Sequence, residues 1–217
     1  MLHFVRNANM SGLVNTLIKE GYLKDPLIID AFSEMHRIEF VQREFEEIAE
    51  ADIPLPIGHG LTISQPKTVA LMMELLNPQK DQNILDVGSG SGWTTAILSY
   101  VVGSNGKVTA IERLSELCEL GKNNVDKFQY VKKGIAEFHL GDGSQGYPHN
   151  APYDRILVSA VTDEIPKALK DQLKIGGKMV IPVRNDIWYL KKNGEDDFYK
   201  EEFPGFSFVP LIEENQL

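Results

Sequence analysis

A glycine turn and two acids form the pattern with the clearest chemistry in this sequence. The motif G-x-G-x-G occupies residues 88–92 and follows directly on the apolar run 83–87, which contains Asp86. Glycines at such a point allow a tight turn and let a ligand approach the backbone closely. Glu112 ends the next apolar run, where nucleotide-binding folds place a carboxylate that accepts ribose hydroxyls. The pattern therefore predicts a nucleotide-binding turn.

The spacing of the glycines and the acid beside them indicate which ligand the turn accepts. Dinucleotide enzymes carry G-x-G-x-x-G, and a pyrophosphate would be repelled by Asp86. An acid suits a ligand that carries an amino group or a sulfonium. The motif Asp-Val-Gly-x-Gly-x-Gly resembles the first motif of S-adenosylmethionine-dependent methyltransferases, which implies S-adenosylmethionine as cofactor and S-adenosylhomocysteine as product. A glycine turn that binds nothing is the alternative.

Composition narrows the class of protein. The chain has 217 residues, 42% of them hydrophobic, which suffices for one domain with its own core. Its 31 acids against 22 bases disfavour a nucleic-acid partner, which would need a basic footprint. The single cysteine, Cys118, is consistent with a reducing cytoplasm. We expect neither a signal peptide at residues 1–6 nor a membrane span, no metal site, and a monomer.

The elements that must position the turn follow from periodicity and capping residues. Helices are predicted at 12–20, capped by Ser11, and at 27–34, opened by Asp25 and Pro26, with a short helix within 44–50. Prolines and glycines in 52–60 predict a shaped, irregular loop. Further helices are expected at 67–76, 93–102, 116–125 and 165–173. Strands are expected at 83–87, 107–112, 137–141, 154–159, 178–183, 187–190 and 206–211, with Gly176 and Gly177 ending the last helix.

This alternation of strands and helices predicts an α/β fold of Rossmann-like type. We expect the fold of S-adenosylmethionine-dependent methyltransferases, with a mostly parallel sheet, an antiparallel edge and an N-terminal helical extension. The whole chain, 1–217, is predicted to be a single methyltransferase domain. Residues 1–60 would form the helical and loop extension, and residues 61–217 the Rossmann-like core.

Several segments of the chain together resemble one family. The stretches 54–66 and 85–92, supported by 37–41, 141–143, 151–154, 173–177, 180–183 and 208–211, resemble protein-L-isoaspartate O-methyltransferase. Membership would imply methyl transfer to the free carboxylate of isoaspartyl residues in damaged proteins, which starts their repair. Two features depart from the family's pattern, namely Lys67, where many members have His or Tyr, and the segment 184–190, which replaces a glycine and a polar turn.

The resemblance also assigns residues to roles. It implies that Ser64 is the catalytic residue and that Asp142 approaches the adenine amino group. From residue type and position alone, Ser64 could equally cap the following helix, and Asp142-Gly143 could be an ordinary turn. The implied cofactor contacts are Ile63, Gln65, Pro66, Asp86, Gly88, Ser89, Gly90, Glu112, Arg113, Gly141, Asp142 and Gly143. The implied substrate contacts are Pro56, Ile57, Thr62 and Ser64, and Ser159 with Ala160 is expected to line the same cleft.

Two other functions compete with this prediction. One is a methyltransferase of the same fold that acts on RNA or a small molecule, which the acidic balance disfavours. The other is a partner-recognition module that keeps the cofactor fold without turnover. His59 could be considered as a base, but a carboxylate substrate is already ionised at neutral pH and needs none.

Overall fold

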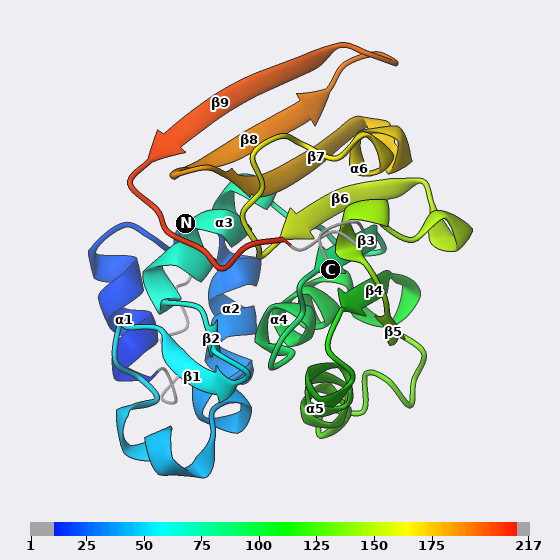
Figure 1. Ribbon diagram of the computed structural model, residues 1–217. Coiled ribbons are helices and arrows are strands. Elements are labelled where there is room, and N and C mark those ends of the chain that lie inside the picture. Colours follow the sequence, from blue (N-terminus) through cyan, green and yellow to red (C-terminus); the bar gives the residue numbers. More distant parts are fainter. Residues whose placement is uncertain (1–10, 212–217) are drawn as a thin grey trace, which may run out of the picture.

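The computed structural model describes residues 11–211 and places a seven-stranded sheet at the centre of the chain (Figure 1). Residues 1–6, on which the expectation of no signal peptide rests, lie outside the described residues. The strand order is β5-β4-β3-β6-β7-β8-β9, parallel from β5 to β7 and antiparallel from β7 to β9. The predicted mostly parallel sheet with an antiparallel edge is confirmed. The strands are β3 (Asn83–Val87), β4 (Lys107–Glu112), β5 (Ala136–Leu140), β6 (Tyr153–Val158), β7 (Leu173–Val183), β8 (Asp186–Lys192) and β9 (Phe198–Pro204).

The sheet order creates a crevice at the carboxyl ends of the central strands. β3 lies between β4, which follows it in sequence, and β6, which the chain reaches only after β5. From β3 the chain first adds β4 and β5 on one side and then crosses to add β6 on the other side. Open α/β sheets bind ligands at the point where the strand order reverses in this way. Ile84, Leu85 and Val87 of β3 are fully buried, as expected for a parallel strand that is covered on both faces.

Helices cover the two faces of the sheet unequally. One face carries α3 (Pro66–Leu76), α4 (Trp93–Val102) and α5 (Ser115–Asp126), while the other carries α6 (Lys167–Gln172). Short 3-10 turns, η4 (Gly143–Gln145) and η5 (Pro148–Asn150), follow β5, and η3 (Gly103–Asn105) follows α4. The predicted helices at 67–76, 93–102 and 116–125 are confirmed within one residue.

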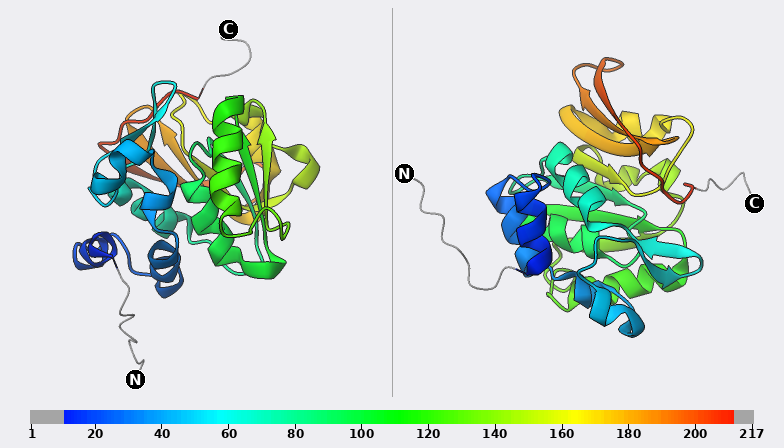
Figure 2. Two further views of the ribbon diagram at one scale, coloured as in Figure 1. Left: turned by 90° about the horizontal axis from the view of Figure 1, so that it is seen from below. Right: turned by 90° about the vertical axis from the view of Figure 1, so that its left-hand side faces the viewer.

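The N-terminal extension forms an outer layer next to α4. It contains α1 (Gly12–Lys19), α2 (Pro26–Glu34), η1 (Arg37–Phe40) and η2 (Arg43–Ile48). Figure 2 shows α1 and α2 at one side of the molecule, outside the helices that touch the sheet. The Ser11 side chain accepts from the Val14 N–H, and Asp25 accepts from two N–H groups of α2, so both predicted caps are confirmed. Phe32 of α2 packs edge-to-face on Trp93 at a centroid distance of 5.5 Å.

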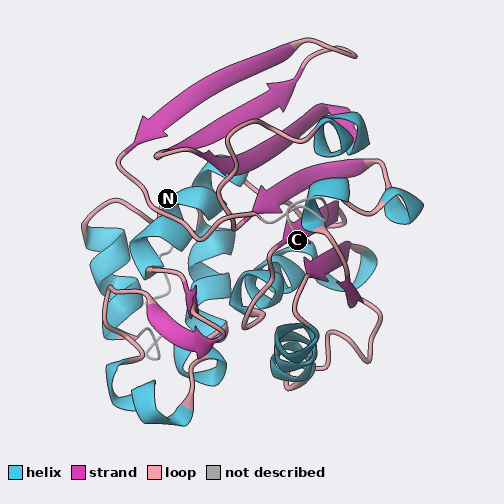
Figure 3. Cartoon of the chain, viewed as in Figure 1, coloured by secondary structure: helices cyan, strands magenta, loops and turns pink. Residues whose placement is uncertain are grey.

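The prediction of an irregular loop over residues 52–60 is wrong. β1 (Leu55–Gly58) and β2 (Leu61–Ile63) pair antiparallel as a short hairpin, visible as two strands in Figure 3. Pro56 is tolerated because each strand of a two-stranded hairpin is an edge, where a missing N–H need not break a ladder. Leu55 and Ile57 are buried while Pro56 is exposed, so the alternation expected of a strand was present between the prolines.

The predictions for the C-terminal third need two corrections. Gly176 and Gly177 do not end a helix but lie within β7, where the pairing with β6 is irregular. The segment 206–211 is not a strand; the outer strand is β9, whose charged residues suit an exposed edge. The segment instead returns toward β6, as Figure 1 shows, with Leu211 donating to the Val161 carbonyl at 2.7 Å. Val209, Pro210 and Leu211 line a cavity, whereas Phe206 and Phe208 pack against the core.

Across residues 11–211 we find no helix with the length and apolar content that a membrane crossing requires.

Candidate active site

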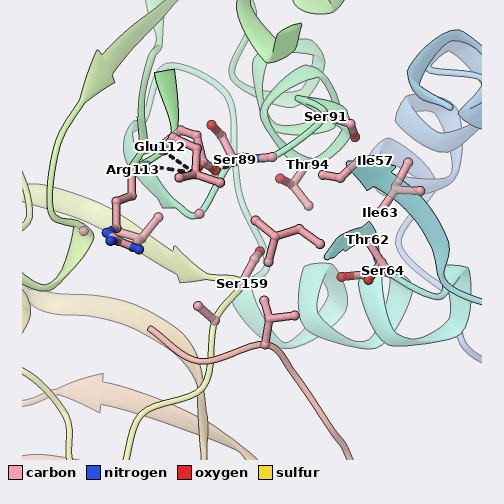
Figure 4. A pocket seen from close by; sticks show the side chains of 18 of the residues that line it. Ile57, Thr62, Ile63, Ser64, Ser89, Ser91, Thr94, Glu112, Arg113 and Ser159 are labelled. Carbon is pink, nitrogen blue, oxygen red and sulfur yellow. Dashed lines mark hydrogen bonds between the residues drawn. The ribbon is translucent and has the colours of Figure 1, made fainter. Parts of the chain in front are cut away.

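A cavity of about 410 Å³ opens at the carboxyl ends of β3, β4 and β6. Its walls come from the β1–β2 hairpin, the glycine turn after β3, the ends of β4 and β5, and the segment 209–211. Figure 4 shows Glu112 and Arg113 on one side, Ile63 and Ser64 on the opposite side, and Ser89 between them. The cavity therefore brings together residues that are separated by almost the whole described chain.

The glycine turn has the backbone that its sequence predicted. Gly88 has φ of +79°, and a Cβ on Gly92 would lie 2.7 Å from the Gly121 carbonyl of α5. Positive φ at Gly88 and the close approach at Gly92 exclude larger residues at both positions. The Gly88 N–H donates to the Ile111 carbonyl at 2.9 Å, which attaches the turn to β4. This attachment holds the turn beside Glu112, which ends that strand.

Ser89, within the turn, lines the cavity and carries a buried hydroxyl without a partner among the described residues. The side chain is 4% exposed, and its Oγ has no hydrogen bond among the described residues. Buried hydroxyl groups are almost always hydrogen-bonded. The Ser89 hydroxyl is therefore an unsatisfied polar group in the turn that borders the cavity.

The Glu112 side chain is hydrogen-bonded to the main chain of the glycine turn. It is 6% exposed, and its Oε2 accepts from the Gly90 N–H at 3.0 Å. Its Oε1 accepts from the N–H groups of Arg113, at 2.8 Å, and Leu114, at 3.1 Å. These bonds orient the carboxylate in the cavity wall, where it can accept further bonds from a bound hydroxyl pair.

Asp86, which the sequence predicts as a cofactor contact, lies behind the turn and does not line the cavity. It is fully buried, and its Oδ2 accepts from the hydroxyls of Thr94, at 2.9 Å, and Thr95, at 2.6 Å. Its Oδ1 has no partner among the described residues. Burial raises the pKa of Asp86 to about 6, and the negative charge of Glu112 adds to the rise. Two acids that repel each other favour a ligand with positive charge.

The hairpin supplies the other wall of the cavity. Ile57, Thr62, Ile63 and Ser64 line it, as expected from the resemblance. Ser64 does not cap α3: the side chain of the N-cap residue makes no capping bond, and the Asp52 Oδ1 accepts from the Lys67 N–H at 2.9 Å. Within residues 11–211, no hydrogen bond to the Ser64 hydroxyl is present. The hydroxyl is thus available to a ligand in the cavity.

Lys67, which departs from the family's pattern, lies outside the cavity wall. Its Nζ pairs with Glu20 at 2.8 Å and Asp52 at 3.2 Å, and it lies 5.6 Å from the centre of the Tyr22 ring. The carboxylates of Glu20 and Asp52 raise the pKa of Lys67. The substitution therefore ties the end of α1 to the start of α3.

Four further expected contacts lie outside the cavity wall. Pro56 is exposed on the hairpin. The Gln65 amide donates to the Asp52 carboxylate at 3.0 Å, and Pro66 is buried at the start of α3. The Asp142 carboxylate accepts from the Ser144 N–H at 2.8 Å and so caps η4. Its neighbours Gly141 and Gly143 do line the cavity.

Some lining residues were missed by sequence reasoning. Ser159 and Ala160 line the cavity as expected, but Thr94 and Leu114 were not predicted. Thr94 follows the predicted contact Gly90 by four positions, and Leu114 follows the predicted contact Arg113 by one. Their closeness to these residues in the sequence is enough to predict them as lining residues. The segment 209–211 was expected to form a strand, so its place in the wall had no signal in local periodicity. His59 also lines the cavity and is exposed there.

No group of three or more His, Cys, Asp or Glu side chains that could hold a metal ion is present in the part of the chain that the structure describes.

Comparison with known proteins points to one family. The family model for protein-L-isoaspartate(D-aspartate) O-methyltransferase matches residues 8–216. A protein-L-isoaspartate O-methyltransferase from Methanopyrus kandleri is 41% identical over 206 residues, covering 93% of this chain and 90% of the relative. One from Methanococcus maripaludis is 43% identical over 208 residues, covering 94% and 96%.

Solved structures agree with this similarity. A Plasmodium falciparum protein, described as a protein-L-isoaspartate O-methyltransferase and crystallised with S-adenosyl-L-homocysteine, superposes with a TM-score of 0.83. It is 24% identical and covers 95% of this chain and 99% of its own, so it supports the fold. A second protein-L-isoaspartate O-methyltransferase has a TM-score of 0.80 at 30% identity, covering 91% of this chain and 64% of its own.

Proposed function

This chain belongs to the protein-L-isoaspartate(D-aspartate) O-methyltransferase family, and on that premise we propose that its cavity methylates the free carboxylate of isoaspartyl residues in damaged proteins. The enzyme is a transferase that depends on S-adenosylmethionine. The observation that carries the proposal is that Ser64 and the glycine turn with Glu112 line one cavity. A cofactor site and a candidate carboxylate site thus face each other.

The residues on the glycine-turn side fit S-adenosylmethionine. Glu112 would accept the ribose hydroxyls, and Ser89, which also lines the cavity, would contact the methionine part. Asp86 acts from behind the turn through its charge, which favours an amino group and a sulfonium. Arg113, Gly88, Gly90, Gly141, Gly143 and Ile63 complete the proposed cofactor contacts. Asp142, Gln65 and Pro66 would support these residues from outside the wall. When bound, the cofactor supplies an activated methyl group.

The chain's own contribution to catalysis is alignment. The attacking carboxylate is ionised at neutral pH, so no general base is required. Ser64 would donate its hydroxyl to one carboxylate oxygen and so direct the other toward the methyl group. Alignment of this kind can lower a barrier by about 7–11 kcal/mol in favourable cases. The apolar Ile57 and the Thr62 hydroxyl would hold the peptide on either side.

The same alignment accounts for a preference for isoaspartyl over aspartyl residues. An isoaspartyl residue carries its free carboxylate one methylene closer to the main chain than an aspartyl residue does. The two peptides have the same charge, so electrostatics does not distinguish them. A displacement of about 1 Å can cost on the order of a hundredfold in rate. We therefore propose that the distance between the peptide main chain and its free carboxylate selects the isoaspartyl peptide. Ser64 holds the carboxylate and the hairpin holds the main chain, so only this distance brings the carboxylate to the methyl group.

The remaining features of the enzyme are inferred from the composition of the cavity wall. The extension and the core both contribute wall residues, for example Ile57 and Glu112, which supports their action as a single domain over residues 1–217. We also propose that the protein is a monomer. The single cysteine and the acidic balance support a cytoplasmic enzyme that does not act on nucleic acid.

Methyl transfer to matched substrates tests the proposal. The protein is given radiolabelled S-adenosylmethionine together with an isoaspartyl peptide, the aspartyl peptide of the same sequence, or bulk RNA. We expect label in the isoaspartyl peptide alone, as a base-labile ester. Equal labelling of both peptides would refute selection by the position of the free carboxylate. Labelled RNA would instead support a nucleic-acid methyltransferase, and cofactor binding without any transfer would support a binding module.

A further inference from the structure

A buried arginine joins the hairpin to the rest of the extension. Arg37, in η1, is 3% exposed and has no acidic partner at ion-pair distance among the described residues. Its guanidinium instead donates to main-chain carbonyl oxygens. The acceptors are Ala49 at 2.8 Å and Ala51 at 3.1 Å from Nη1, and Ile53 at 2.8 Å, Ile63 at 3.4 Å and Ser64 at 3.1 Å from Nη2.

The last of these acceptors is the main chain of the proposed catalytic residue. A bond to the Ser64 carbonyl restrains the peptide unit from which the Ser64 side chain extends into the cavity. The same nitrogen also bonds the Ile53 carbonyl, just before the hairpin. Arg37 therefore fixes both ends of the hairpin, since Ile53 precedes β1 and Ser64 follows β2.

Arg37 is connected to the cofactor side of the cavity as well. Its guanidinium carbon lies 5.6 Å from the centre of the Trp93 ring. Trp93 begins α4 directly after the glycine turn, lines the cavity, and donates its indole N–H to the Met35 carbonyl at 2.9 Å. One side chain thus contacts both the segment that carries Ser64 and the residue that follows the cofactor turn.

The contacts of Arg37 require a guanidinium rather than another cationic group. Burying an unpaired charge is costly, and here burial lowers the pKa of Arg37 to about 10, although it remains protonated at neutral pH. Five main-chain carbonyls around one side chain suit a guanidinium, which presents five N–H donors in a rigid fork, whereas an ammonium has three. The Nε of Arg37 is buried without a partner among the described residues, and the residue lines a second cavity of about 230 Å³.

We propose that Arg37 is a positioning residue that sets the Ser64 hydroxyl at the correct distance from the cofactor turn. The inference rests on the proposed function, because it assumes that Ser64 aligns the substrate carboxylate. Arg37 touches neither the substrate nor the cofactor in this account. Its loss should therefore lower kcat while KM for the peptide and the affinity for S-adenosylhomocysteine change little.

Arg155 provides a matched control. It is also a buried arginine, 9% exposed, that donates to main-chain carbonyls, at 2.8 Å from Nε to Leu76 and 2.8 Å from Nη1 to Asp154. The Leu76 carbonyl lies at the end of α3 remote from Ser64. Loss of Arg155 removes comparable bonds without touching the hairpin.

The experiment compares Arg37→Lys and Arg37→Met with Arg155→Lys and Arg155→Met. Melting temperature, S-adenosylhomocysteine affinity by calorimetry, and kcat and KM on an isoaspartyl peptide are measured for each. We expect kcat to fall on the order of a hundredfold in Arg37→Met and about tenfold or more in Arg37→Lys, with cofactor affinity within about threefold. In the Arg155 variants we expect lower melting temperatures and kcat within about twofold. A third variant, Arg37→Ala, leaves space for a small cation, and millimolar guanidinium should restore part of its kcat, whereas methylammonium should not.

The outcomes separate a positioning role from a structural one. Retained kcat in folded Arg37→Lys, or an equal loss in the Arg155 variants, would overturn the inference. If Arg37→Met does not fold, Arg37→Lys and the guanidinium rescue provide the test. If the unmodified enzyme fails to methylate the isoaspartyl peptide, the proposed function fails and the positioning role with it. That outcome is distinct from loss in the variants alone.

Discussion

The Asp52 carboxylate caps α3 by accepting from the Lys67 N–H at 2.9 Å. Asp52 is fifteen positions before Lys67, so the cap comes from the segment that leads into the hairpin. The same carboxylate accepts from Gln65 at 3.0 Å and pairs with Lys67 Nζ at 3.2 Å. These partners offset its partial burial and lower the pKa of Asp52. Asp52, and not Ser64, therefore caps α3.

The first prediction separates the roles of Ser64 and Asp52. Ser64→Ala should lower turnover on an isoaspartyl peptide by about tenfold or more while the melting temperature hardly changes, because no cap is lost. Asp52→Ala should destabilise the fold by about 1 kcal/mol, the usual cost of a lost cap. Thermal unfolding and initial rates measured on the same samples test both variants. A Ser64→Ala protein that melts earlier yet keeps its rate would end the catalytic assignment.

The second prediction concerns Glu112. Glu112→Gln should weaken S-adenosylhomocysteine binding by one to two decades, because bonds to a charged group contribute about 1.5–3 kcal/mol. Calorimetry provides the measurement, and Glu119→Gln, on the exposed side of α5, serves as control. Unchanged affinity in a folded Glu112→Gln protein would remove Glu112 from the ribose site.

The third prediction follows from the raised pKa of Asp86, about 6 in the fold against a usual value of 3.8. Between these values the folded chain retains a proton that the unfolded chain has released. The contribution of Asp86 to stability is therefore highest below about pH 4 and falls as the pH rises to 6, by about 3 kcal/mol in total. Asp86→Asn should abolish this loss and raise the free energy of unfolding at pH 7. Urea unfolding at about pH 4.5 and pH 7 measures the free energy of unfolding of the unmodified protein and of Asp86→Asn. An identical pH dependence in the two proteins would contradict the raised pKa of Asp86.

The same substitution makes a fourth prediction about ligands. S-adenosylmethionine carries a sulfonium charge that S-adenosylhomocysteine lacks. If Asp86 acts through its charge, Asp86→Asn should weaken binding of S-adenosylmethionine more than binding of S-adenosylhomocysteine. Competition calorimetry gives the ratio of the two affinities, and equal weakening of both would show that Asp86 supports the turn only by its hydrogen bonds.

The fifth prediction compares two glycines in the cavity wall. A Cβ on Gly143 would lie 2.4 Å from Val87 Cγ1, whereas nothing lies within 4 Å of a Cβ on Gly141. Gly143→Ala should therefore cost about 1–3 kcal/mol of stability through overpacking. Gly141→Ala should keep its stability but weaken S-adenosylhomocysteine binding, since the added methyl group projects into open space at the site. Normal cofactor affinity in Gly141→Ala would show that the ligand does not reach this part of the wall.

Much of the cofactor half of the site was determined by the sequence itself. The bounds predicted for β3, α4 and β4 agree with the structure, and Glu112 lies beside the turn. The bounds of these elements arise within short stretches, where apolar periodicity, glycine conformation and strand ends act locally. Glu112 comes beside the turn through the parallel pairing of β3 with β4, which the strand–turn–helix–strand pattern predicts.

The substrate half was decided by tertiary structure. The Asp52 cap, the Arg37 bonds and the place of 209–211 in the wall each depend on contacts that local periodicity does not record. Asp86 was assigned to the wall because its residue type fits a cationic ligand, but the packing of α4 encloses it behind the turn. Local pattern does not encode such relationships, because they depend on which main-chain groups the folded chain brings within hydrogen-bond distance.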